Sequence, residues 1–281
     1  MMEIGEALRL ERLNLGLTQK QMCQDILSRP FYAKVESGKN GISADNLLRI
    51  LLAHHIDVND FFELTKKTYM SQEKILTEQL ENNMYWAVNA KNIDLLERYC
   101  HKILALPDNE IFKLRAIVTV AYFKGNLDEI SDNLPEKLKK ILNEGENWTK
   151  HPELLRLLAN TIPLWPQDEL DFLIGRLLTS IKNKKLPELM LEQYLRIFGN
   201  YLVTCYEREI YHNEKYHDHI NDVIKYTINE TSTFKLMIYR IQTYYMTSLF
   251  ENDIQRAIEI KNDLKKYGYD KITASWPSCD L

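Results

Sequence analysis

The sequence predicts an all-α protein with a small N-terminal domain and a larger C-terminal stack of helix pairs. Apolar residues recur at spacings of three and four along most of the 281-residue chain, as on the buried face of a helix. Strict alternation of apolar and polar residues, which would indicate strands, is missing. Glycine (9 residues) and proline (8 residues) are scarce, so turns are few and the helices between them must be long.

Composition narrows the class of protein. Hydrophobic residues make up 45% and charged residues 27% of the chain, which is typical of a globular protein. No run of about 18 apolar residues is present, so no membrane contact is expected. The N-terminus is interrupted by charged residues and lacks the apolar segment of a signal peptide. The four cysteines are far apart in sequence, which favours reduced thiols in a cytoplasmic protein.

Five short helices are expected in the N-terminal domain, residues 1–66. The first covers residues 3–15 and ends at Gly16, because glycine commonly follows a helix C-terminus. Thr18 then caps a second helix, which extends to Ile26.

The next three helices have equally clear signals. Ser28 caps the third helix, and Pro30 lies in its first turn, where the missing N–H costs nothing. This helix ends at Gly38. Ser43 caps the fourth helix, and the fifth begins near Val58.

Three segments of this domain resemble the Xre/Cro-type helix-turn-helix over residues 1 to 65. They are Gly16-Leu17-Thr18-Gln19, Val35-Glu36-Ser37-Gly38-Lys39 and Ser43. The resemblance implies that the third helix enters the major groove of double-stranded DNA by its N-terminal end. It also implies a phosphate contact for Gln19 and an internal ion pair between Arg12 and Glu36.

The leading end of the third helix carries the expected contacts to DNA bases. Arg29 can donate two hydrogen bonds to a guanine, or it is only a solvated charge near the cap. Lys34 contacts a base or only a phosphate. Pro30 occupies a position that often reads a base in the family, and proline cannot donate. The expected DNA-binding residues are Gln19, Ser28, Arg29, Pro30, Lys34 and Lys39.

The charge of the N-terminal domain favours a homodimer. Residues 1–68 contain nine Lys and Arg residues and nine Asp and Glu residues, so their formal charge is zero. Neutralisation of phosphates supplies most of the nonspecific affinity for DNA, so one such domain should bind weakly. Two linked domains raise the effective concentration of the second.

The remaining residues, 67–281, are expected to form tetratricopeptide-like helix pairs. Two similar segments, Asn92-Ile-Asp-Leu and Asn126-Leu-Asp-Glu, lie 34 residues apart (126 − 92), which is the length of such a pair. Stacked pairs form a concave groove. Helices are predicted near residues 71–90, 93–106, 110–124, 128–143, 152–161, 167–182, 187–205, 208–229, 232–250 and 253–267.

Two of these helices carry an Arg and an Asn four residues apart, which places both side chains on one helix face. Arginine can bind a carboxylate and asparagine a peptide backbone, although such residues also tie neighbouring helices together. The expected peptide-binding residues are Arg156, Asn160, Arg196, Asn200, Tyr201 and Tyr239.

The whole chain resembles the Rgg/MutR family of regulators in its domain order and in its closing segment, Phe250 to Tyr269. The resemblance implies a homodimeric transcription regulator controlled by a short hydrophobic signalling peptide. Two alternatives stay open: control by another signal or none, and a protein-interaction module with degenerate DNA binding. No enzymatic signature, cofactor or metal site is expected, and His212, His217 and His219 are interpreted as a solvated helix start.

Overall fold

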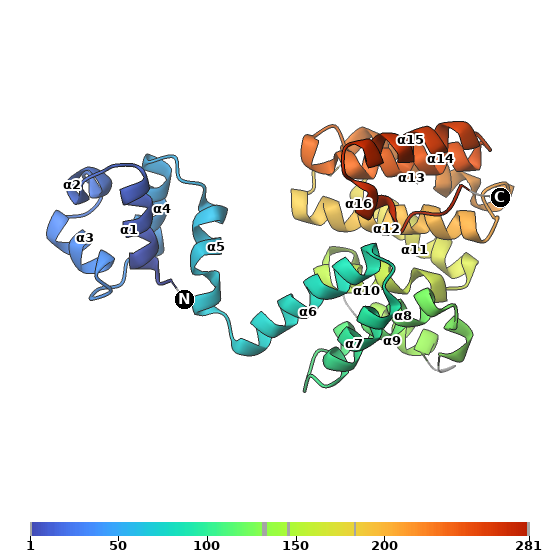
Figure 1. The fold of residues 1–281 in the computed structure, drawn as a ribbon, viewed down its shortest axis with the longest axis horizontal. Coiled ribbons are helices and arrows are strands. Elements are labelled where there is room, and N and C mark those ends of the chain that lie inside the picture. Colours follow the sequence, from blue (N-terminus) through green and yellow to red (C-terminus); the bar gives the residue numbers. More distant parts are fainter. Residues whose placement is uncertain (1, 131–133, 145–146, 183, 280–281) are drawn as a thin grey trace. The chain divides into compact units, whose positions relative to one another are not determined.

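The structure, a computed structural model, describes residues 2–130, 134–144, 147–182 and 184–279. These residues form helices and connecting segments and contain no strand, which confirms the predicted all-α class (Figure 1). The chain divides into two compact units, Met1–Gln79 and Leu80–Leu281. The expected domain boundary at residue 66 falls inside a helix that continues to Tyr69.

The N-terminal unit contains five helices followed by the start of a sixth. The five are α1 (Ile4–Asn14), α2 (Gln19–Cys23), α3 (Arg29–Glu36), α4 (Ala44–Ala53) and α5 (Val58–Tyr69). Their apolar faces meet in one core, in which the side chains of Leu8, Tyr32, Ile50 and Phe61 have no exposed area. Burial of this kind contributes about 1.5–3 kcal/mol for each large apolar side chain.

Two of the three predicted capping residues, Thr18 and Ser43, accept capping hydrogen bonds, and Ser28 does not. Thr18 Oγ1 accepts from the backbone N–H of Gln21, and the Gln21 side chain accepts from the Thr18 N–H. One boundary was predicted wrongly: α2 ends at Cys23 rather than at Ile26, because Gln24 leaves the helical region with a positive φ of 40° and ψ of −131°.

Close contact between α1 and α3 depends on Gly5. A Cβ atom added at this residue would overlap the Val35 carbonyl oxygen of α3. Only glycine therefore allows the two helix backbones to approach this closely. The contact fixes how α3 is presented relative to the rest of the unit.

The second unit begins within α6 (Gln72–Asn89). Its further α-helices are α7 (Ile93–Leu104), α8 (Glu110–Lys124), α9 (Leu134–Glu144), α10 (Pro152–Thr161), α11 (Gln167–Ile181), α12 (Glu188–Glu207), α13 (Glu214–Glu230), α14 (Met237–Phe250), α15 (Ile254–Lys266) and α16 (Asp270–Thr273). Four short 3₁₀ helices lie between them: η1 (Leu127–Glu129), η2 (Trp148–Lys150), η3 (Ile162–Leu164) and η4 (Phe234–Leu236).

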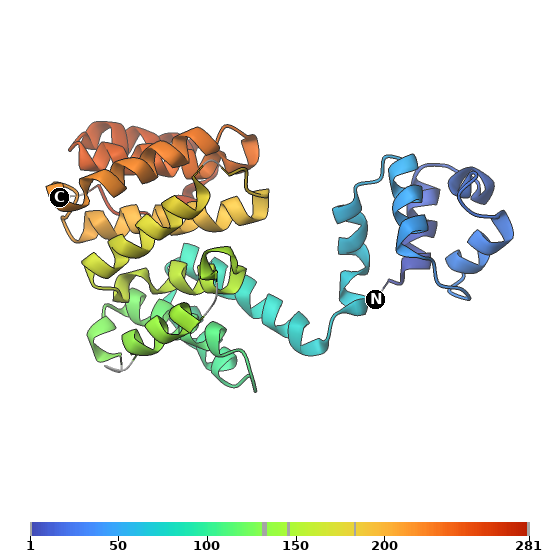
Figure 2. The same ribbon diagram turned by 180° about the vertical axis from the view of Figure 1, so that it is seen from behind.

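The helices of this unit stack in two layers. In one layer α8 packs on α10, α10 on α12, and α12 on α14, while in the other α11 packs on α13 (Figures 1 and 2). Three hydrogen bonds show that α10 and α12 run in the same direction. Going along α12, Tyr194, Asn200 and Arg208 donate in turn to the carbonyl oxygens of Thr149, Ala159 and Trp165.

Most of the predicted helices of this unit are confirmed to within a few residues, and three differ. The helix predicted over residues 232–250 begins at Met237, after the separate 3₁₀ helix η4. The helix predicted over residues 208–229 begins only at Glu214, because Glu209 has a positive φ of 54° and Asn213 caps the helix that follows. The helix predicted from residue 128 begins at Leu134, and residues 131–133 lie outside the described part of the chain.

Candidate nucleic-acid interface and polar face

The leading end of α3 is open to solvent. Ser28 occupies the N-cap position, and its side chain is exposed together with those of Arg29, Pro30 and Lys34. The Ser28 hydroxyl forms no capping hydrogen bond with the described residues. This end of the helix therefore presents a free hydroxyl and the cationic side chain of Arg29 to a ligand, and Lys34 is exposed further along, in the last turn.

A buried ion pair links the last residue of α3 to α1. Arg12 on α1 donates to both carboxylate oxygens of Glu36, from Nε to Oε1 at 2.6 Å and from Nη2 to Oε2 at 3.1 Å. Gln19 Nε2 donates to Glu36 Oε2 at 2.9 Å, and Arg12 Nη1 donates to the Leu17 carbonyl. The carboxylate thus connects α1, α2 and α3.

The same contacts shift the pKa of Glu36. Glu36 is only 6% exposed, and this burial alone would raise its pKa. Hydrogen bonds from Arg12 and Gln19 outweigh the burial, so the pKa of Glu36 lies below its usual value. The network is therefore charged at neutral pH.

The second unit carries a connected network of polar side chains, here called the polar face. It crosses α6, α8, α10, α12 and α14. Its members are Glu81, Tyr85, Arg115, Glu153, Arg156, Asn160, Glu192, Arg196, Asn200 and Tyr239. Members on one helix are separated by three, four, seven or eight residues, which places them on one side of that helix.

Glu81 and Arg115 form the centre of the network between α6, α8 and α10. Arg115 Nη1 donates to Glu81 Oε1 at 2.8 Å, and Arg115 Nε donates to Asn160 Oδ1 at 2.9 Å. Arg156 Nη1 lies 3.0 Å from Glu153 Oε1 and 3.7 Å from Glu81 Oε2. Burial lowers the pKa of Arg115, and Glu81 supports its charged form.

The network continues on α12 and α14. Arg196 Nη2 donates to Glu192 Oε1 at 3.2 Å, and the Tyr239 hydroxyl donates to the same oxygen at 3.0 Å. The Arg196 guanidinium also lies 6.0 Å from the ring centre of Tyr85 on α6, within the range of a cation–π contact.

Several polar atoms of this face remain available. Among the described residues, Asn160 Nδ2 and Asn200 Oδ1 have no hydrogen-bond partner, although the other half of each amide is engaged. Arg156 uses a single Nη atom, and the side chains of Arg156 and Arg196 are 36% and 42% exposed. Each Asn is thus anchored to a neighbouring helix and still offers one atom to a ligand.

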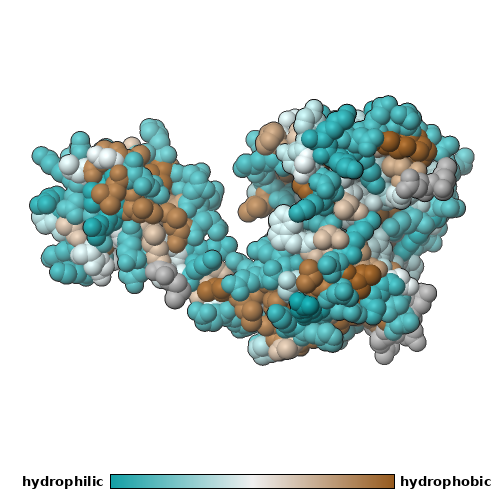
Figure 3. Space-filling model, viewed as in Figure 1, coloured by the Kyte–Doolittle hydropathy of each residue, from teal (hydrophilic) through white to brown (hydrophobic). Residues whose placement is uncertain are grey.

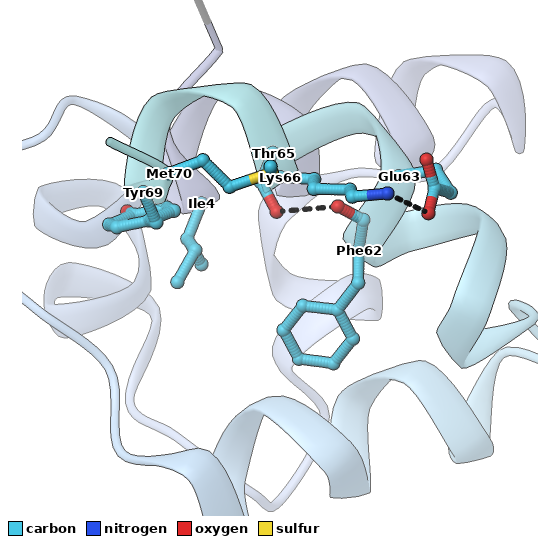
Figure 4. Close-up of a pocket in the computed structure, with 7 residues that line it drawn as sticks. All are labelled: Ile4, Phe62, Glu63, Thr65, Lys66, Tyr69 and Met70. Atoms are coloured by element: carbon cyan, nitrogen blue, oxygen red, sulfur yellow. Dashed lines mark hydrogen bonds and ion pairs between the residues drawn. The ribbon is translucent and has the colours of Figure 1, made fainter. Parts of the chain in front are cut away.

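Apolar side chains are also exposed on the N-terminal unit (Figure 3). A shallow hollow is lined by Ile4 of α1 and by Phe62, Tyr69 and other residues of α5 (Figure 4). Its polar side chains are occupied locally, since Lys66 pairs with Glu63 at 3.3 Å. The hollow is thus lined mainly by apolar side chains.

Residues 8–61 match the family model described as helix-turn-helix. The N-terminal unit contains a helix-turn-helix domain. The matched range runs from α1 through the first turn of α5 and includes α2 and α3. The family match thus covers the exposed leading end of α3 and the ion pair that holds it. No curated protein sequence matches the chain.

Solved structures with the same fold match both units. A candidate transcriptional regulator from Listeria monocytogenes EGD-e is 18% identical with a TM-score of 0.72, covering 96% of this chain and 93% of that one. The SHP pheromone receptor Rgg2 of Streptococcus dysgalactiae is 15% identical with a TM-score of 0.64, covering 97% of each chain. PlcR of Bacillus thuringiensis, in complex with the peptide PapR7 and DNA, is 17% identical with a TM-score of 0.58, covering 97% of this chain and 99% of that one. The chain therefore has the fold of these regulators.

The helix-turn-helix domain places the expected DNA-binding residues in two environments. Ser28, Arg29, Pro30 and Lys34 lie together at α3, and the exposed Lys39 follows its C-terminal end. Gln19 differs, because its amide donates to Glu36 inside the domain. One of its two N–H groups is therefore already used in holding α3.

Five of the six expected peptide-binding residues lie on the polar face, and Tyr201 does not. The Tyr201 side chain has no exposed area, and its hydroxyl donates to Asp171 Oδ1 at 2.9 Å. A fully buried ring has no surface to offer a peptide, so Tyr201 belongs to the core. His219 also differs from the expected solvated position, because its Nδ1 lies 2.8 Å from Asp171 Oδ2.

Sequence reasoning missed the acidic half of the polar face. Glu153 and Glu192 lie three and four residues before Arg156 and Arg196, so helix spacing could have identified them. Glu81 and Arg115 are 34 residues apart, and no local pattern connects them. Among the described residues, no cluster of His, Cys, Asp or Glu could hold a metal ion, and no helix is long and apolar enough to span a membrane.

Proposed function

We propose that the protein is a cytoplasmic, homodimeric transcription regulator that binds double-stranded DNA and is controlled by a short hydrophobic signalling peptide. The observation that carries this proposal is the exposed leading end of α3 with Arg29, and Lys34 further along the helix, in a helix-turn-helix domain joined to a helical stack. A chain of this fold has been solved with a peptide and DNA bound.

The geometry of the helix-turn-helix domain supports major-groove binding. The N-terminal residues of such a recognition helix contact base edges, while neighbouring basic residues contact phosphates. Arg29 is the first residue of α3 and has the donors to bind a guanine through two hydrogen bonds. Lys34 and Lys39 supply positive charge beside it.

The polar face supports peptide binding. An extended peptide has unpaired backbone N–H and C=O groups, and Asn160 and Asn200 each keep one amide atom free to bind them. Tyr239 adds a hydroxyl fixed by Glu192. These are the side chains that we assign to the peptide, together with Arg156 and Arg196.

Two observations support a homodimer. The helix-turn-helix domain has a formal charge of zero over residues 1–68, so one domain should bind DNA weakly. Large apolar side chains are also exposed on α4 and α5, including Leu52, Phe62 and Tyr69. An exposed apolar surface of this kind is typical of a protein interface.

Selection of DNA from a random duplex library by the full-length protein tests the proposal. We expect enrichment of one consensus whose two half-sites are related by symmetry, because a twofold dimer reads a palindrome. Failure to enrich any sequence would instead favour a protein-interaction module. Fluorescence anisotropy with the selected duplex then gives the affinity at a stated salt concentration.

A further inference from the structure

The polar face is partly covered by a residue of its own chain. Glu81, on α6, reaches α8 through Arg115 at 2.8 Å and approaches Arg156 of α10 at 3.7 Å. One helical turn later, Tyr85 lies beside Arg196 of α12. A single side of α6 thus contacts three helices of the stack.

Each glutamate of the polar face is paired with donors of the same chain, whereas some guanidinium N–H groups of the face are not paired. Each of the three glutamates already has two partners: Glu81 has Arg115 and Arg156, Glu153 has the same two, and Glu192 has Arg196 and Tyr239. Among the described residues, Nε and Nη2 of Arg156 have no partner, whereas Arg196 interacts with both Glu192 and Tyr239. A cationic ligand group would therefore compete with the arginines already paired to these carboxylates, whereas an anionic group would find free guanidinium N–H groups on Arg156.

The contact between Glu81 and Arg156 is the weaker of the two that Glu81 makes. Its 3.7 Å separation is longer than the 2.7–2.9 Å of a charge-assisted hydrogen bond. The Arg156 side chain is also 36% exposed, whereas that of Arg115 is 15% exposed. Arg156 can therefore exchange partners while Arg115 stays in place.

We propose that the ligand of the polar face is a peptide with a free carboxylate, which replaces Glu81 beside Arg156 and is also held by Arg196. This inference rests on the proposed peptide-sensing function and specifies the chemistry of the ligand. Glu81 acts as an internal competitor for the site. Because Glu81 lies on α6, and α6 begins at Gln72 in the N-terminal unit, the exchange alters a contact that holds this helix to the stack.

Three pools of synthetic peptides test the inference. All are N-acetylated octapeptides of Gly, Ala, Val, Leu, Ile and Ser in random order. The first pool has a free C-terminal carboxylate, the second a C-terminal amide, and the third a C-terminal amide with one Asp. Retention by the immobilised full-length protein is measured by mass spectrometry. The first and third pools distinguish a terminal from a side-chain carboxylate.

We expect at least one carboxylate pool to be retained about tenfold more than the amide pool, which corresponds to one charge-assisted interaction. Glu81→Gln removes the competing charge but keeps an acceptor for Arg115, so it should fold and raise this retention further. Glu97→Gln is the matched control, because Glu97 pairs with Lys124 at 2.7 Å outside the polar face. It should behave as the wild type does.

Each result has a distinct meaning. Equal retention of all three pools overturns the carboxylate requirement and leaves the peptide-sensing function standing. A carboxylate preference that Glu81→Gln does not strengthen overturns the role of Glu81 as competitor. If neither the wild type nor Glu81→Gln retains any pool, the peptide-sensing function itself fails.

Discussion

Arg12 and Glu36 form a two-point ion pair, with distances of 2.6 and 3.1 Å, at the junction of α1, α2 and α3. The side chains are 12% and 4% exposed, so both charges are largely removed from water. Neither contacts the exposed end of α3. The pair therefore positions the recognition helix without contributing a contact to DNA.

Arg12→Ala should destabilise the N-terminal unit by about 3–5 kcal/mol, because it leaves the Glu36 carboxylate buried and unpaired. All four tryptophans lie between residues 86 and 276, so their fluorescence reports only the second unit. Urea unfolding followed by circular dichroism and by tryptophan fluorescence separates the two units. In the control Arg49→Ala, loss of the exposed pair with Asp45 should cost less than about 1 kcal/mol.

The ion pair should also make the N-terminal unit sensitive to acid. The pKa of Glu36 is lower in the folded state than the value of about 4.3 expected when unfolded. The stabilisation is therefore complete above the unfolded pKa and is lost as pH falls through the folded pKa. The difference in unfolding free energy between wild type and Glu36→Gln should be constant above about pH 5 and shrink below it. A difference independent of pH from 7 to 3 would contradict this.

Arg29→Ala should weaken binding to the selected DNA by about 1–3 kcal/mol and leave binding to unrelated duplexes nearly unchanged. The reason is that a base contact discriminates between sequences and a phosphate contact does not. Lys39→Ala should instead weaken binding to every duplex. Anisotropy titrations with both kinds of DNA provide the comparison, and an equal loss for Arg29→Ala would reassign Arg29 to the phosphates.

Asn200→Ala should reduce peptide retention while costing only about 1 kcal/mol of stability. The substitution removes one hydrogen bond, from Nδ2 to the Ala159 carbonyl at 2.8 Å, along with the free amide oxygen. Thermal unfolding and retention of the carboxylate peptide pools are measured together. Asn262→Ala, at an exposed residue of α15, is the control. Unchanged peptide retention would remove Asn200 from the site.

The native protein should contain one reactive thiol. Cys23, Cys100 and Cys205 are buried, and burial raises the pKa of each, that of Cys205 to about 12. Cys279 is half-buried near the C-terminal end. Ellman's reagent at pH 8 should therefore modify one thiol quickly in the folded protein and four in guanidinium chloride. Cys279→Ser should abolish the fast phase, and rapid modification of this variant would show that a buried helix opens.

Local sequence signals predicted most helices because those signals act within a few residues. The helices over residues 110–124 and 152–161 begin and end where they were predicted. The errors fall where a residue leaves the helical region for another conformation. Gln24 and Glu209 both adopt positive φ, and neither is a glycine, so composition offered no warning.

The candidate sites also contain residues that local spacing placed correctly and one that it did not. Helix periodicity placed Arg156 with Asn160 and Arg196 with Asn200, since residues four apart share a face by geometry alone. The same periodicity did not show that the ring of Tyr201 would be buried against Asp171. Exposure of a side chain depends on which helices cover it, and helix packing is a property of the whole chain.

By itself, the sequence determined the helical class, the helix-turn-helix at the N-terminus and the exposed cations of α3, because each follows from capping, spacing and residue type nearby in the chain. Only the tertiary structure decided that Glu81 reaches Arg115 and Arg156 and that Tyr85 lies beside Arg196. Those contacts join residues 34 to 111 positions apart (115 − 81 and 196 − 85). Their partners are selected by the stacking of helices, which buries apolar surface and brings distant charges within reach.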